Sequence, residues 1–307
     1  MFSTIIITVL GLCLFEIISS IDNAIVNAEV LGTMSRKARN WFLLWGFLFA
    51  VFIIRGVLPW LIVWAAMPSL GFIGSFTATF SNDPSVHTAI ASASPILLLG
   101  GGVFLIFLFL HWLFLEKKTV GLSHERFFQK GGVWFFAVVS IILAVIVWYA
   151  MKINPMLAFS AVIGSTAFFI THGFKENAER GEEKLISKEN KMSDLSKIFY
   201  LEIIDATFSI DGVLGAFAFT LSVPLIILGN GLGAYILRKL TMSNIERIKK
   251  YVYLKNGAMY SIFVLGIIML CDSFGVEIPY YISPLITFII IGFFVYKSIN
   301  HNKKMSI

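Results

Sequence analysis

Five carboxylates stand inside long apolar stretches of this sequence, and an amide lies beside one of them: Glu16, Asp22, Glu202, Asp205 and Asp211, with Asn23 next to Asp22. A carboxylate at the centre of a lipid-embedded helix costs about 2.5–3.5 kcal/mol. We therefore expect these side chains to face the interior of a helix bundle, where they can pair, share protons or hold a cation. Carboxylate, amide and carbonyl oxygens are hard ligands that suit Mg²⁺, Ca²⁺ or Mn²⁺.

The carboxylates belong to two copies of one motif, at residues 16–23 and 202–212. Each copy contains Glu-Ile-Ile followed by Ser-Ile-Asp, and the two parts are separated by one residue in the first copy and by four in the second. This difference is close to one helical turn.

Helical geometry decides which of these carboxylates can act together. On a straight helix Glu16 and Asp22 are about 240° apart, and Glu202 and Asp211 about 180° apart, so neither pair shares a face. Either the Glu and Asp of each copy serve different partners, or the helices are interrupted near Ser-Ile-Asp so that both converge. Glu202 and Asp205 are neighbours at i and i+3 and need no interruption.

Composition identifies the elements that must position these residues. Of the 307 residues 58% are apolar and 14% are charged, and mean hydropathy is +0.85. Soluble domains contain about 45–50% apolar and about 25% charged residues, so a soluble, disordered or fibrous protein is excluded. We expect an all-α polytopic membrane bundle of about nine spans. They lie at roughly 4–31, 41–66, 95–115, 133–151, 155–173, 198–220, 224–238, 257–272 and 281–297.

The basic residues predict the orientation of the spans. With the N-terminus outside and the C-terminus inside, 22 of the 24 Lys and Arg residues fall in cytoplasmic segments. Lys152 is the external one, and Arg55 lies within a span. This is the bias that orients membrane proteins. The net charge of +6 therefore reflects topology, and we expect no nucleic-acid partner.

The same topology makes the two motif copies antiparallel, because the first span runs inward and the sixth runs outward. Such inverted-topology repeats place substrate and ion sites near the bilayer midplane. We expect one integral-membrane domain, 1–307, in three parts. Residues 1–115 form the first half, residues 116–197 form inserted spans and a charged cytoplasmic linker, and residues 198–307 form the second half.

Basic residues could also neutralise the carboxylates, which would give them a purely structural role. Arg55 must find an acidic partner within the bundle, and Lys255 is a second candidate charge partner. Since one or two basic residues leave a negative remainder among five carboxylates, a cation pathway is favoured. His111 and His172 each stand alone in their span, which favours a packing or interfacial role.

At both motif copies the sequence resembles the TerC family of integral membrane proteins, which is named for tellurium resistance and belongs with the lysine-exporter-like transporters. The resemblance continues through Arg55-Gly56, Gly100–Gly102, Asn230–Gly233, Leu237-Arg238 and Tyr253–Gly257. Gly212 departs from the family, which often has a polar residue at this position. The resemblance implies an ion-binding set of Glu16, Asp22 and Asn23 from one half and Glu202, Asp205 and Asp211 from the other.

Several TerC proteins are implicated in Mn²⁺ export or metal homeostasis. The resemblance therefore implies a transporter in the inner or plasma membrane of a bacterium that exports a divalent cation, with Mn²⁺ favoured and protons as the candidate counter-ion. No GxxxxGK[ST] loop is present, so ATP is not expected to drive it directly. We expect no permanently bound cofactor, and partners limited to the lipid bilayer, the metal, protons and other copies of the chain.

Two other functions remain open. The protein could be a non-transporting membrane scaffold or assembly factor in an envelope or tellurite stress response, with the acidic cluster fixing helix packing. An intramembrane metalloenzyme is less favoured, because the sequence lacks an HExxH or similar catalytic pairing. We therefore do not expect an enzyme.

Overall fold

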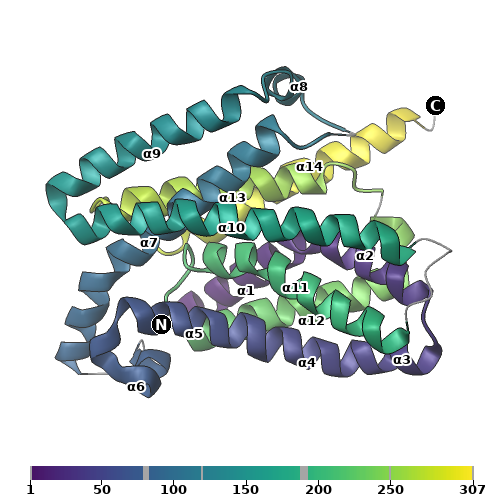
Figure 1. The fold of residues 1–307 in the computed structure, drawn as a ribbon, viewed down its shortest axis with the longest axis horizontal. Helices are drawn as coiled ribbons and strands as arrows, with labels where there is room; N and C mark the ends of the chain where they lie inside the picture. Colours follow the sequence, from purple (N-terminus) through teal and green to yellow (C-terminus); the bar gives the residue numbers. More distant parts are fainter. Residues whose placement is uncertain (1, 79–82, 119, 187–192, 249, 306–307) are drawn as a thin grey trace.

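The computed structural model describes residues 2–78, 83–118, 120–186, 193–248 and 250–305. Every regular element in these ranges is a helix, and most long helices lie near the long axis of the molecule (Figure 1). Within these ranges seven helices are long and apolar enough to cross a membrane, judged by length and composition. The all-helical membrane bundle predicted from the sequence is therefore confirmed.

Each predicted span coincides with helical structure. The first corresponds to α1 (Phe2–Ser19) and α2 (Ile21–Gly32), and the second to a composite helix over residues 36–66. The others correspond to α7 (Pro84–Phe114), α9 (Trp134–Ile153), α10 (Pro155–Ile186), α11 (Asp194–Ala216), α12 (Val223–Ile248), α13 (Leu254–Ser273) and α14 (Ile282–Met305). Two of these segments fall outside the seven candidate spans. They are the first, whose apolar helix Ser3–Ser19 is short, and α11, which contains three of the carboxylates.

The two motif copies differ in their backbone. In the first copy α1 ends at Ser19 and α2 begins at Ile21, with Ser20 between them at φ −99° and ψ 5°. Backbone hydrogen bonds still cross this point, from Ser20 N–H to the Glu16 carbonyl (3.1 Å) and from Ala24 N–H to the Ser20 carbonyl (3.0 Å). The second copy lies within the continuous helix α11. An interruption, which was one of two alternatives for these motifs, is therefore present in the first copy alone, as a local distortion.

The second span is not a uniform α-helix. It consists of α3 (Arg36–Trp41), η1 (Phe42–Gly46), α4 (Phe47–Phe49), η2 (Ala50–Val57) and α5 (Leu58–Ala66), in which η1 and η2 are π-helical. π-Helical turns are rare and occur frequently at functional sites. Here they contain Gly46 and Arg55.

Two helices extend beyond their predicted limits. α7 begins at Pro84 rather than near residue 95, because Asp83 caps it by accepting a hydrogen bond from Ser85 N–H (2.9 Å) and proline suits the first helical position. Part of the predicted external loop forms the short helices η3 (Pro68–Leu70) and α6 (Gly71–Thr77). α10 continues to Ile186, through much of the predicted charged linker, of which residues 187–192 lie outside the described ranges.

Glycines bring the central helices together. α7 packs against both α10 and α13. A Cβ at Gly102 would lie 3.0 Å from the carbonyl oxygen of Gly266 in α13. One at Gly164 in α10 would overlap the backbone of Gly100. Small residues allow this close approach between membrane helices. The short helix α8 (Ser123–Gln129) lies between α7 and α9 in the chain, and α9 lies at the periphery of the bundle (Figure 1).

Candidate functional site

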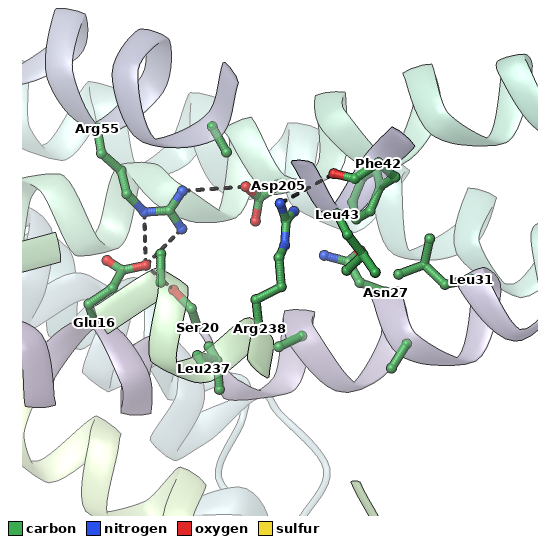
Figure 2. Close-up of a pocket in the computed structure, with 14 residues that line it drawn as sticks. Glu16, Ser20, Asn27, Leu31, Phe42, Leu43, Arg55, Asp205, Leu237 and Arg238 are labelled. Carbon is green, nitrogen blue, oxygen red and sulfur yellow. Dashed lines mark hydrogen bonds and ion pairs between the residues drawn. The ribbon is translucent and has the colours of Figure 1, made fainter. Parts of the chain in front are cut away.

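Arg55 joins the two motif copies inside the bundle. Its Nε and Nη2 atoms donate to Glu16 Oε1 at 2.8 and 2.7 Å, and its Nη1 donates to Asp205 Oδ2 at 3.4 Å. The side chains of Arg55 and Glu16 are 3% and 1% exposed, so this ion pair is shielded from solvent. Glu16 belongs to the first copy and Asp205 to the second. Figure 2 shows that each carboxylate contacts the guanidinium group.

Three helices hold this arrangement in place. Glu16 lies on α1, Arg55 on η2 and Asp205 on α11. Glu16 also accepts a hydrogen bond from the Ser20 hydroxyl (2.9 Å), one turn later on the distorted part of the first span. Gly212 of the second copy lies beside Glu16, since a Cβ there would be 3.1 Å from Oε2. The glycine that departs from the TerC pattern thus allows the two copies to approach each other.

A small cavity of about 40 Å³ adjoins the Arg55 ion pairs. A water molecule needs at least about 10–15 Å³ measured this way, so the cavity has room for a few waters or one small ion. Its polar lining comes from Glu16, Ser20, Asn27, Arg55, Asp205 and Arg238 (Figure 2). Asn27 is buried, and its Oδ1 has no hydrogen-bond partner in the described part of the chain. Sequence reasoning missed Asn27, which lies one turn beyond Asn23 on α2.

Arg238 is a second arginine at the same cavity. From α12 its Nη1 donates to the Phe42 carbonyl (3.4 Å), and its guanidinium carbon lies 4.6 Å from the centre of the Phe42 ring. The sequence analysis assigned Arg238 to a cytoplasmic segment, because it ends an apolar run. Its long side chain instead reaches into the bundle. The cavity lining thus contains two arginines and two carboxylates in the described residues, and their formal charges balance.

Glu202 is not among the residues that line this cavity. Its carboxylate lies against Gly46 of η1, so closely that a Cβ there would overlap Oε1. Both carboxylate oxygens are buried and have no hydrogen-bond partner among the described residues. Glu202 lines a separate, apolar groove between the second span and α11.

Asp211 and Lys255 do not line the cavity at Arg55. Asp211 pairs with Lys175 of α10 (3.2 Å), and both side chains are largely buried. Lys255 at the start of α13 forms an ion pair with Glu116, and both side chains are partly exposed. The structure therefore brings Glu16, Asp205 and Arg55 together, and places Asp211 and Lys255 outside this group. The side chains of Asp22 and Asn23 lie outside the described ones, and their backbone forms the first turn of α2.

His111 and His172 are adjacent, although each is alone in its own span. Their ring centres lie 3.7 Å apart, between α7 and α10, and Phe168 stacks on His172 with ring centres 5.7 Å apart. The pair could not be found from sequence because it depends on how α7 packs against α10. No group of three His, Cys, Asp or Glu side chains in the described part of the chain is close enough to hold a metal ion. Glu16 and Asp205 hold Arg55 instead.

Comparison with known proteins assigns the chain to one family. Neither the curated proteins nor the solved structures contain a significant match. Residues 21–305 match the family described as "Protein of unknown function (DUF475)". This range includes Arg55, Asp205 and Arg238, and begins after Glu16. Because it covers most of the sequence, the chain belongs to the DUF475 family.

Proposed function

We propose that this protein is a membrane transporter that exports a divalent metal cation, with Mn²⁺ as the favoured substrate and protons as the counter-ion. The observation that carries this proposal is the meeting of Glu16 and Asp205, one from each antiparallel motif copy, at a single buried cavity. Carboxylates in such a place are costly unless they pair or bind ions. The resemblance to TerC proteins supports the same function.

In this proposal Arg55 takes the place of the substrate. Its guanidinium group neutralises Glu16 and Asp205 while no metal is bound, and a cation entering the cavity displaces it. Asn27 and Ser20 then supply neutral oxygen ligands beside the two carboxylates. Protonation of the carboxylates on the far side weakens metal binding, which couples the exit of the cation to the entry of protons.

Uptake of Mn²⁺ into inverted membrane vesicles tests the proposal. The double variant Glu16→Gln/Asp205→Asn removes both candidate ligands and is expected to abolish uptake above the vesicle background. Glu277→Gln removes an exposed carboxylate in the connection between α13 and α14, and should transport like the wild type. Uptake by the double variant at the wild-type rate would exclude this site.

Some variants can fail because they fold poorly. Glu16→Gln alone leaves Arg55 buried without its closest partner, which is strongly destabilising. The variant Glu16→Gln/Arg55→Gln removes one charge of each sign and leaves the net charge of the cavity unchanged. If this variant is folded and also fails to transport, the loss reflects the missing ion pair rather than unfolding.

A second candidate function is a non-transporting membrane scaffold or assembly factor in an envelope or tellurite stress response. It is favoured by the balance of two arginines and two carboxylates at the cavity, which resembles an ion-pair network that fixes helix packing. If the protein is a scaffold, the cavity variants lower the melting temperature and abundance of the protein but leave cellular Mn unchanged. If it is a transporter, cellular Mn rises in cells that express a folded but inactive variant.

The remaining parts of the proposal concern where the protein acts. We place it in the inner or plasma membrane of a bacterium, as a relative of TerC proteins, working without a permanently bound cofactor and without enzymatic activity. Assembly with further copies of the chain is compatible with this function.

A further inference from the structure

Asn230, in the first half of α12, is a buried polar side chain whose amide is not paired within the described residues. It is 0% exposed, and neither its Nδ2 nor its Oδ1 atom has a hydrogen-bond partner in the described part of the chain. Leaving a buried amide unpaired is destabilising, and most buried polar groups in folded proteins are hydrogen-bonded. Packing alone therefore does not explain an asparagine at this position.

The direction in which Asn230 points follows from its neighbours on α12. A Cβ at Gly229 would lie 2.5 Å from Leu12 of α1, and one at Gly231 would lie 3.1 Å from Val51 of η2. Successive residues of a helix are turned by about 100°. Asn230 therefore points midway between α1 and η2, into the interior of the bundle.

The same strip of α12 lines the cavity at Arg55. Ala234 and Leu237 are lining residues, and they are turned from Asn230 by only about 40° and about 20°. They lie about 6 Å and about 10 Å further along the helix. Because α12 runs inward in the predicted orientation, Asn230 lies about one turn beyond the cavity, on its outer side.

α11 places a second polar group in the same direction. Ser209 lies one turn after Asp205 and is turned from it by about 40°, and α11 runs outward in the predicted orientation. Ser209 is 3% exposed, and its hydroxyl donates to the Asp205 carbonyl, which leaves its oxygen free to act as an acceptor. Buried neutral oxygens on two helices thus continue outward beyond the carboxylates.

We propose that Asn230 and Ser209 form the outer half of the cation path, where their neutral oxygens receive the cation after it leaves Glu16 and Asp205. This inference rests on the function proposed above and adds an exit to it. Neutral oxygens hold a divalent cation less tightly than carboxylates do, because affinity depends on the charge of the ligands. A weak outer site suits release, since a permeating ion must be able to leave each site that it enters.

The variant Asn230→Leu tests the role of the amide, because it removes the polar atoms and keeps nearly the same side-chain size. We expect it to slow Mn²⁺ uptake into inverted vesicles by about tenfold or more, the effect of losing one polar contact with a charged group. The melting temperature of the variant should stay unchanged or rise, because the unpaired amide is gone. A purely structural role predicts the reverse, a lower melting temperature and an unchanged rate. Thr287→Val, which removes a buried hydroxyl on α14, is the control and should transport like the wild type.

Thiol labelling distinguishes failure of this inference from failure of the proposed function. In a background in which Cys13 and Cys271 are serine, Asn230→Cys should react in intact cells with a small cationic methanethiosulfonate that does not cross membranes. Thr287→Cys, which is similarly buried, should not react. If the wild type takes up no Mn²⁺ but Asn230→Cys reacts, the path stands and the proposed substrate is wrong. An unreactive Asn230→Cys, or uptake by Asn230→Leu at the wild-type rate, would overturn the inference.

Discussion

At the scale of single residues, helical geometry explains why the carboxylates separate into different environments. Asp205 and Asp211 are six residues apart on one continuous helix, which turns them by about 240°. Asp205 therefore faces Arg55 while Asp211 faces Lys175 of α10. The need of Arg55 for an acidic partner could be predicted from the apolar sequence around it. Its choice of Glu16 and Asp205 could not, because that depends on how three helices pack.

Arg238 shows a further limit of sequence reasoning at this scale. An arginine at the end of an apolar run is a typical marker of the cytoplasmic boundary. Its long side chain can nevertheless run along the helix surface and carry its charge several ångströms from its own backbone. In this protein the guanidinium group reaches back to Phe42 and changes the charge balance of the cavity.

The ion pair between Arg55 and Glu16 should behave as one energetic unit. Replacing either residue alone leaves a buried, unpaired charge, so Arg55→Gln and Glu16→Gln should each lower the free energy of unfolding by about 3–5 kcal/mol. The double variant should lose much less than the sum of the two. Chemical unfolding of the three variants in detergent measures this coupling. Additive losses would show that the two side chains do not interact as described.

At the scale of elements, the second span is the one that sequence analysis described least well. Its position was predicted from a long apolar run, but nothing in that run distinguishes π-helical from α-helical turns. The π-helical segments change the faces on which Gly46 and Arg55 lie. The cavity at Arg55 and the groove at Glu202 share no lining residue. Neither the cavity nor the groove could be predicted from sequence, because both depend on how the helices pack.

The contact between α7 and α10 should tolerate no added side chain at Gly164. A Cβ there would overlap the backbone of Gly100, which cannot move aside as a side chain could. We expect Gly164→Ala to lower the free energy of unfolding by about 1–3 kcal/mol. Gly292→Ala on α14 is the control, because no atom lies within 4 Å of the added Cβ, and it should be neutral or slightly stabilising. Thermal unfolding of both variants in the same detergent provides the comparison.

The start of α11 is joined to the start of α3 by a pH-dependent contact. Asp194 accepts hydrogen bonds from the Ser35 hydroxyl (2.6 Å) and amide (3.2 Å), and these hold the pKa of Asp194 below its usual value of 3.8. The folded state therefore favours the ionised carboxylate. Its contribution to stability is complete above pH 3.8 and is lost as the pH falls through the lower folded-state pKa.

Hydrogen exchange at the start of α3 can detect this contact. Protection of residues 35–40, corrected for intrinsic exchange rates, should be constant above pH 3.8 and fall as the pH is lowered below that value in the wild type. Ser35→Ala should already show the lower protection at the higher pH. If protection depends on pH in the same way in the wild type and in Ser35→Ala, the contact between Asp194 and Ser35 is not pH-sensitive.

At the scale of the whole molecule, composition and charge were enough to predict a helical membrane bundle and the positions of its helices. The division into two halves and an insertion stays a prediction. α10, from the inserted part, packs closely against α7 of the first half and pairs through Lys175 with Asp211 of the second. α10 therefore contributes to the interior of the bundle, and its sequence alone could not reveal these contacts.

The orientation of the bundle makes a prediction that cysteine labelling can test. The free cysteines, Cys13 and Cys271, lie within helical segments and can be replaced by serine to give a cysteine-free background. With the N-terminus outside, Lys152→Cys should react in intact cells with a maleimide that does not cross membranes. Arg126→Cys, on α8 at the opposite end of the bundle, should react only after the cells are opened, because the basic connections face the cytoplasm. Labelling of Arg126→Cys but not Lys152→Cys in intact cells would require the reverse orientation, and export through the cavity would then become import.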